Sequence, residues 1–238
     1  MIMIEVGGLR EGVMRDNFIA FYSNVFELPN VKVIGIGTNL TCMYGVLPNE
    51  DKLIQLSLYK QLLEAKFNKQ IPYISGGASV TIPLILNGLI PSGINHFRVG
   101  ETLYLGTDVY YSKPYDHMHN DVFKLFAEII ELNEKPSIPS GALGHNLTGE
   151  VASFDQTLMG TSSYRAIVDV GFLDVEDGHI YPVDKCMQIV GASSDMIVVD
   201  HGENPRKLKV GDSIEFSLDN MGITRIMNSD YVEKKFEE

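Results

Sequence analysis

Residues 71–79 read IPYISGGAS, and residues 94–101 read INHFRVGE. Each stretch is an apolar run followed at once by small or glycine residues, the pattern of a buried strand that ends where a helix begins. Successive strand–helix units predict parallel strands joined by right-handed crossovers, with functional loops at the carboxyl ends of the strands. We therefore expect Ser79 and Arg98, which follow or end two such strands, to lie at the same edge of one sheet.

The same alternation of strand and helix covers the first 110 residues, and either a barrel or an open sheet fits it. Residues 1–6 should form a fully buried strand, because Ile2, Met3 and Ile4 are consecutive apolar residues. The other expected strands are 31–37, 71–75 and 93–97, and the expected helices are 13–26, 50–67 and 79–89. A domain seldom begins inside a core strand, so the chain is expected to be a fragment, a split gene product or the result of a misplaced start.

The pattern changes after about residue 120. Residues 122–132 alternate like a strand or a long β-arm, and the segment KPSIPSG at 135–141 cannot be helix interior. Short β-rich pieces separated by glycine and aspartate turns follow at 164–170, 187–190, 196–199 and 213–218. The prediction is an α/β domain at 1–121, followed by an all-β domain at 122–238.

Charge and composition exclude several classes of protein. The net charge is −12 and the sequence is 45% hydrophobic, which favours a folded core and argues against binding to nucleic acid or to anionic membrane surfaces. No apolar run approaches the length of a membrane span. Cys42 and Cys186 are far apart and form no CxxC pair, so a disulfide framework or zinc site is not expected, and the cytoplasm is the predicted compartment.

Ser79 and Gly100 both lie where a helix is expected to begin after glycine-containing sequence. Glycines let a ligand approach the backbone, and the first N–H groups of a helix attract phosphate. The Ser79 hydroxyl and the N–H groups of Gly100 and Glu101 are therefore candidate phosphate donors. The alternative is an ordinary turn in which Ser79 caps its own helix.

Three other polar residues follow or end expected strands: Arg10, Asn39 and Arg98. Arg98 ends an apolar strand, and a partly buried guanidinium must find a partner because it stays charged. That partner is either a ligand or a carboxylate such as Glu5 or Glu101. Polar residues at four successive strand ends favour a binding site at this edge of the sheet.

The residues resemble a known family, the pyridoxal-phosphate-dependent amino-acid racemases of the alanine racemase fold, and most closely its ornithine racemase-like branch. The matching stretches occur in the family's order and run nearly end to end: 7–12 (GGLREG), 35–42 (GIGTNLTC), 75–79 (SGGAS), 98–106 (RVGETLYLG), 135–141 (KPSIPSG), 165–174 (RAIVDVGFLD) and 191–200 (GASSDMIVVD). The resemblance implies a partial TIM-type barrel of the later β/α units plus a C-terminal β-domain. It also implies a homodimer.

The resemblance also implies roles for individual residues. Ser79, Gly100 and Glu101 would hold the cofactor phosphate, and Arg98 would face the pyridine nitrogen. Arginine only donates hydrogen bonds, so it would keep that nitrogen unprotonated. Asn39 would stand where related racemases have a histidine beneath the ring, and Arg10 would lie near the phenolic oxygen.

The sequence departs from the family at other positions. The lysine that binds the cofactor belongs to a strand that has no counterpart here, and none of this chain's lysines stands in a motif that matches the one around that lysine. Glu5 and Gly8 stand where the family usually has aspartates. The second proton-transfer residue aligns with His145, which is either that residue or an exposed loop histidine. His117 and His119 lack further ligands around them and are interpreted as part of a polar loop, so no metal site is predicted.

The leading interpretation is the C-terminal portion of a pyridoxal-phosphate-dependent racemase or epimerase that moves the α-proton of an α-amino acid, such as ornithine. The chain alone is expected to be inactive, and a second copy or a separately encoded N-terminal fragment is the expected partner. The alternative is a truncated relative without catalytic activity that serves as a scaffold or partner subunit. DNA just upstream that encodes a strand with the lysine motif would favour the enzyme.

Overall fold

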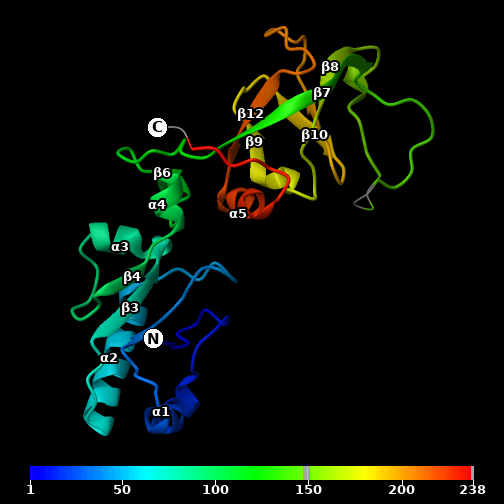
Figure 1. Ribbon diagram of the computed structural model, residues 1–238. Coiled ribbons are helices and arrows are strands. Elements are labelled where there is room, and N and C mark those ends of the chain that lie inside the picture. Colours follow the sequence, from blue (N-terminus) through cyan, green and yellow to red (C-terminus); the bar gives the residue numbers. More distant parts are fainter. Residues whose placement is uncertain (147–148, 150, 237–238) are drawn as a thin grey trace. The chain divides into compact units, whose positions relative to one another are not determined.

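A computed structural model describes residues 1–146, 149 and 151–236 (Figure 1). The chain divides into two compact units, 1–120 and 121–238. The first unit contains β/α elements and the second is mainly β, as the change of sequence pattern near residue 120 indicates. Within the described ranges, no helix is both long enough and apolar enough to cross a membrane.

The first unit is built on a four-stranded parallel sheet with the order β1-β2-β3-β4. Its strands are β1 (Ile2–Met3), β2 (Gly35–Gly37), β3 (Tyr73–Ala78) and β4 (His96–Arg98). Its helices are η1 (Arg15–Asn17), α1 (Phe18–Glu27), α2 (Glu50–Phe67), η2 (Ser79–Thr81), α3 (Ile82–Leu86) and α4 (Glu101–Leu105). A two-stranded antiparallel pair, β5 (Thr107–Asp108) and β6 (Lys113–Pro114), follows α4.

Helix α2 has the bounds that the sequence predicts. Asn49 caps its first turn, with the side-chain oxygen accepting from the Lys52 N–H at 3.0 Å. Asn68 ends it in the left-handed conformation at φ 49°. Leu53, Leu56 and Leu63 are fully buried in the core of this unit.

The two faces of the sheet differ in their packing. A Cβ on Gly76 would lie 2.6 Å from Ile94 and 3.6 Å from Leu53, so Gly76 faces the helices and leaves room for them. A Cβ on Gly37 would lie 2.9 Å from the Ser75 Cβ and 3.2 Å from the Met3 sulfur, on the other side of the sheet. Ser75 therefore belongs to the face opposite α2, because alternate residues of a strand point to opposite faces.

The prediction of a fully buried strand at residues 1–6 is wrong. Only Ile2–Met3 pairs as a strand, with β2, and both residues are half-buried. Ile4 is buried and bridges to Val13. The reason is that β1 is an edge of the sheet: among the described residues it has a strand neighbour on one side only.

The second unit is a six-stranded antiparallel sheet with the order β10-β11-β8-β7-β12-β9, which nearly closes into a barrel. Its strands are β7 (Lys124–Pro136), β8 (Ser162–Val168), β9 (Ile180–Pro182), β10 (Gln188–Ala192), β11 (Ile197–Asp200) and β12 (Ser213–Leu218). Leu125, Ala127 and Ile129 alternate into its core. The 3-10 turns η3 (Gln156–Leu158) and η4 (Asp177–His179) and helix α5 (Asn220–Asn228) complete it.

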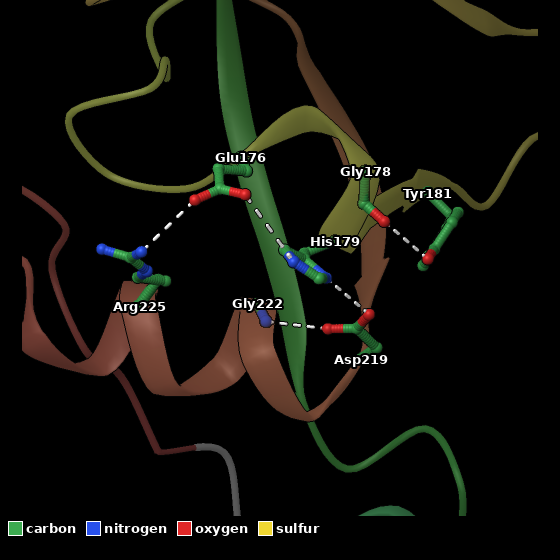
Figure 2. Close-up of polar contacts among 7 residues, drawn as sticks. All are labelled: Glu176, Gly178, His179, Tyr181, Asp219, Gly222 and Arg225. Atoms are coloured by element: carbon green, nitrogen blue, oxygen red, sulfur yellow. Dashed lines mark hydrogen bonds and ion pairs between the residues drawn. The ribbon is translucent and has the colours of Figure 1, made fainter. Parts of the chain in front are cut away.

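Figure 2 shows how α5, which the sequence reasoning missed, attaches to this unit. Asp219 caps α5 by accepting from the Gly222 N–H at 2.8 Å through one oxygen, and its other oxygen contacts His179 Nδ1 at 2.8 Å. Glu176 contacts Arg225 of the helix at 3.3 Å. One aspartate thus satisfies the helix terminus and ties it to the turn before β9, which explains why a short helix with a glycine in its first turn is stable.

We expect Gly222→Ala to destabilise the second unit. Alanine is favoured over glycine inside a helix by about 1 kcal/mol, but a Cβ here would collide with the backbone carbonyl oxygen of His179. Chemical denaturation monitored by circular dichroism should show a lower midpoint than for the native chain. Gly178→Ala, where a Cβ meets open space, is the control. A Gly222→Ala variant as stable as the control would contradict the packing of α5.

His201 is buried in the second unit, with 2% of its surface exposed, and its Nε2 has no hydrogen-bond partner among the described residues. Burial lowers the pKa of this imidazole, while the nearby carboxylates of Asp200 and Asp184 act in the opposite direction. The folded chain therefore takes up this proton only at a lower pH than the unfolded chain does.

The neutral His201 therefore makes its full contribution to the free energy of unfolding above about pH 6.5. This contribution is lost as the pH falls below that value. Unfolding free energies measured from pH 7.5 to 5.0 should decline, and the His201→Gln variant should show a shallower decline. An identical slope in the native chain and His201→Gln would contradict this assignment.

Candidate cofactor-binding site

Arg98, the last residue of β4, lies at the carboxyl edge of the parallel sheet. Its guanidinium donates to the Ser75 hydroxyl and, at 3.0 Å, to the carbonyl oxygen of Thr38. Burial lowers the pKa of this side chain and the charge of Glu11 opposes that shift, so Arg98 remains a cation at neutral pH. Among the described residues, Arg98 forms no ion pair with Glu5. The arginine is held in place by neutral groups on β3 and after β2.

Arg10 and Asn39 meet at the same edge through a residue that the sequence reasoning passed over, Glu11. The Glu11 carboxylate accepts from the Arg10 guanidinium, with the second contact at 3.0 Å, and from the Asn39 amide at 3.2 Å. The bond from Arg10 lowers the pKa of Glu11, and Asn39 adds to this. The same bond raises the pKa of Arg10. Arg10, Asn39 and Glu11 thus form one charged group within electrostatic range of Arg98.

Ser79 is nearly fully buried, and its hydroxyl lies at the start of α4. The oxygen accepts from the N–H groups of Gly100 and Thr102, both at 3.2 Å. The expectation that Ser79 caps its own helix is wrong: it is the first residue of η2, and Ala78 precedes it without a side-chain cap. Ser79 instead accepts hydrogen bonds at the start of α4, because the register of β3 and β4 places Ala78 opposite Arg98.

This arrangement suits an anion. A hydroxyl that accepts two N–H bonds keeps its own proton to donate, and N–H groups at the start of a helix carry partial positive charge. Arg98 adds a full positive charge on the neighbouring strand. The residues present therefore fit the phosphate and the ring of a pyridoxal phosphate, although Thr102 rather than Glu101 supplies the second N–H that points at Ser79.

The structure brings together six of the seven residues singled out in the sequence: Arg10, Asn39, Ser79, Arg98, Gly100 and Glu101. All six lie in the first unit, at or just after the carboxyl ends of β1 to β4. His145 lies in the second unit, is exposed, and contacts the Gly149 carbonyl oxygen through Nδ1 at 2.8 Å. Leu147 and Thr148, which follow His145 closely in the sequence, lie outside the described residues.

Sequence reasoning missed three residues of the site: Glu11, Ser75 and Thr102. A signal existed for Ser75, because it faces away from the helices by the alternation of β3 and precedes the glycines of SGGAS. The sequence held no such signal for Glu11 and Thr102, because Glu11 contacts Asn39, 28 residues away, and Thr102 contacts Ser79, 23 residues away. In the part of the chain that the structure covers, no group of three or more potential metal ligands occurs.

Comparison with known proteins identifies the family of this chain. The family profile described as "Alanine racemase, N-terminal domain" matches residues 1–108. The chain is 36% identical to the ornithine racemase of Acetoanaerobium sticklandii over 236 residues, 99% of this chain and 66% of that protein. The chain belongs to the family of pyridoxal-phosphate-dependent racemases with the alanine racemase fold.

Two further comparisons, one by sequence and one by fold, are consistent with this assignment. It is 35% identical to the lysine racemase of Thermotoga maritima, over 99% of this chain and 64% of that protein. The alanine racemase of Bartonella henselae with covalently bound pyridoxal phosphate shares the fold at 19% identity and a TM-score of 0.55, over 90% of this chain and 56% of that one. The chain thus spans about two thirds of the length of the curated relatives that it matches. The shared fold confirms the fold class expected from the sequence.

Proposed function

We propose that this chain is the cofactor-binding portion of a pyridoxal-phosphate-dependent amino-acid racemase with a basic substrate such as ornithine or lysine. The observation that carries the proposal is the joint position of Ser79, Gly100 and Arg98 at one sheet edge. It is supported by the two curated relatives, which are named for ornithine and lysine. Pyridoxal phosphate would supply an electron sink that makes the α-proton of a bound amino acid acidic.

The residues of the first unit would bind and orient this cofactor. The Ser79 hydroxyl would donate to the phosphate, and the N–H groups of Gly100 and Thr102, which donate to that hydroxyl, would hold it in position. Arg98 would donate to the ring nitrogen, fixed in that direction by Ser75 and the Thr38 carbonyl. Arg10 would approach the phenolic oxygen, with Glu11 and Asn39 holding it in position.

His145 would serve as a proton-transfer residue. Its Nδ1 donates to the Gly149 carbonyl oxygen at 2.8 Å, which leaves the lone pair of the neutral ring on Nε2. That nitrogen could take a proton from a substrate and return it. This role requires His145 of one subunit to reach the cofactor site of the same or a second subunit.

The edge of β1 supports the proposal of a partner. Among the described residues β1 pairs with β2 alone, and Ile2 and Met3 are only half-buried. Such an edge can accept another strand. A second copy of the chain or a separately encoded fragment would complete the sheet. The same edge favours the alternative function, a scaffold that binds a partner through this strand without catalysing a reaction.

Titration with pyridoxal phosphate, monitored by absorbance and by fluorescence, tests the cofactor site. The native chain should bind it reversibly. Ser79→Ala should bind about tenfold more weakly or worse, because a hydrogen bond to a charged group contributes about 1.5–3 kcal/mol. Ser57→Ala is the matched control, since the Ser57 hydroxyl donates only within α2, to the Leu53 carbonyl.

Pyridoxal, which lacks the phosphate, should bind the native chain and Ser79→Ala equally. Failure of the native chain to bind pyridoxal phosphate at millimolar concentration would refute the cofactor site and favour the scaffold. Equal loss of phosphate and non-phosphate ligands in Ser79→Ala would refute the phosphate role of Ser79.

A further inference from the structure

Helix α2 carries an apolar stripe on the face that points away from the core. Ile54, Leu58 and Leu62 are exposed to 40%, 56% and 47% of their surface. Their four-residue spacing places them along one ridge of the helix. The buried residues Leu53, Leu56 and Leu63 lie on the opposite side, so the helix is apolar on two faces. A helix with a single apolar face is sufficient to cover a sheet.

The two ends of the stripe carry opposite charges. Glu50 and Asp51 are exposed in the first turn of α2, and Lys66 is exposed in the last turn. No ion pair joins any of these three side chains to another described residue. At about 1.5 Å per residue, the two charged ends are roughly 24 Å apart, with the apolar stripe between them.

We infer that α2 is a docking surface for a second copy of this chain, packed against the same helix in antiparallel orientation. The pattern is symmetric about Leu58: a two-fold axis there would place Leu58 against Leu58 of the second copy and Ile54 against its Leu62. Glu50 and Asp51 of each copy would then lie toward Lys66 of the other. An interface of this kind uses the same patch on both subunits.

Charge selects this orientation. A parallel pairing would bring the acidic ends together and the basic ends together, whereas the antiparallel one brings opposite charges together at both ends. The dipoles of the two helices would also oppose each other favourably. A single helix pair buries less surface than a standard interface of about 1,600 Å², so the dimer should be weak and dependent on concentration.

This inference goes beyond the proposed function and does not depend on it. No residue of the stripe belongs to the cofactor site, and the free edge of β1 is a different surface. The dimer contact on α2 and the binding of pyridoxal phosphate can therefore each fail without affecting the other.

Analytical ultracentrifugation of the 238-residue chain over a concentration series up to about 1 mM tests the contact. The native chain should shift from monomer to dimer. Leu58→Glu should weaken the dimer at least tenfold. Leu86→Glu, the same change at an exposed leucine of α3, should not. A native chain that stays monomeric at every concentration, or a dimer that survives Leu58→Glu, would overturn the inference.

Charge reversal then tests the antiparallel register. Glu50→Lys should weaken the dimer, because it would place two lysines together at each end of the interface. Adding Lys66→Glu to Glu50→Lys should restore it. A double variant no tighter than the single one would refute the register, provided that circular dichroism shows an intact helix in both.

Disulfide trapping gives an answer that does not depend on affinity. In a chain with Cys42→Ser and Cys186→Ser, Leu58→Cys should form a cross-linked dimer under mild oxidation, since each Leu58 lies on the two-fold axis. Leu86→Cys in the same background should remain reduced. Equal cross-linking of the two variants would contradict the assigned surface.

Discussion

The 238-residue chain is expected to racemise neither ornithine nor lysine on its own, even with saturating pyridoxal phosphate. The cofactor reacts through an amine of the protein, which family members supply as a lysine. No described lysine forms a hydrogen bond or an ion pair with Ser79, Arg98 or Arg10. Lys52, which reaches the end of β1, donates its amine to the Val6 carbonyl oxygen at 2.6 Å. Pyridoxal phosphate should therefore bind this chain without a covalent bond.

Two measurements check this expectation. Chiral chromatography of each L-amino acid after incubation should show no D-enantiomer above the rate of free pyridoxal phosphate. Borohydride reduction followed by mass analysis should find no stoichiometric pyridoxyl adduct on any one lysine. The ornithine racemase of A. sticklandii, treated in the same way, is the positive control. Activity together with a specific adduct would show that a lysine of this chain replaces the one expected from the family.

Mixing the chain with a fragment of a relative tests whether a partner gives it activity. If a fragment covering the remaining third of a relative confers racemisation when it is mixed with this chain, the partner proposal is supported. If cofactor binds but no such fragment confers activity, the scaffold becomes the better interpretation. Each outcome is independent of the contact proposed for α2.

Gly12→Ala is expected to disrupt both the start of the chain and the cofactor site. Gly12 has φ 137°, which side-chain-bearing residues rarely adopt. A Cβ there would lie 2.7 Å from the Ile4 carbonyl carbon and would also collide with the Glu5 nitrogen. Because these are backbone atoms, the turn at 7–12 must move, and with it Arg10 and Glu11. Backbone strain of this kind costs about 1–3 kcal/mol even without the collision.

Unfolding in denaturant and titration with pyridoxal phosphate should both report this change. Gly12→Ala should unfold at a clearly lower denaturant concentration and bind the cofactor more weakly. Gly45→Ala separates strain from collision, because Gly45 also has positive φ, 67°, but open space around it. If the two variants unfold alike, the close packing of Gly12 against the end of β1 is wrong.

Local patterns in the sequence predicted the elements whose causes are local. Helix α2 has a capping asparagine, a run of helix-forming residues and a left-handed terminal residue, all within 20 positions, and its bounds were predicted correctly. Strand β7 alternates apolar and polar residues, which gave its position but not its length to Pro136. Helix α5 was missed because its stability depends on the contact of Asp219 with His179, 40 residues earlier.

For the candidate site, the sequence predicted the positions of the residues but not their contacts. The residues at the strand ends, Arg10, Asn39, Ser79 and Arg98, could be identified from the sequence, because parallel β/α order sends the carboxyl ends of neighbouring strands to one edge. Which groups they contact could not be predicted. Hydrogen bonds such as Arg98 to Ser75 and Asn39 to Glu11 join residues more than 20 positions apart, and sequence spacing carries no information about such distances.

The sequence by itself determined the family resemblance, the change from β/α units to β-structure near residue 120 and the edge of the sheet at which Arg10, Asn39, Ser79 and Arg98 lie, because these depend on the order and periodicity of residues. Only the tertiary structure decided that β1 is a half-buried edge, that Ser79 accepts hydrogen bonds at the start of α4 rather than capping its own helix, and that Glu11 holds Arg10 and Asn39. Burial and hydrogen bonding of this kind depend on which strands become neighbours and at what register, and that is settled when the whole sheet packs against its helices.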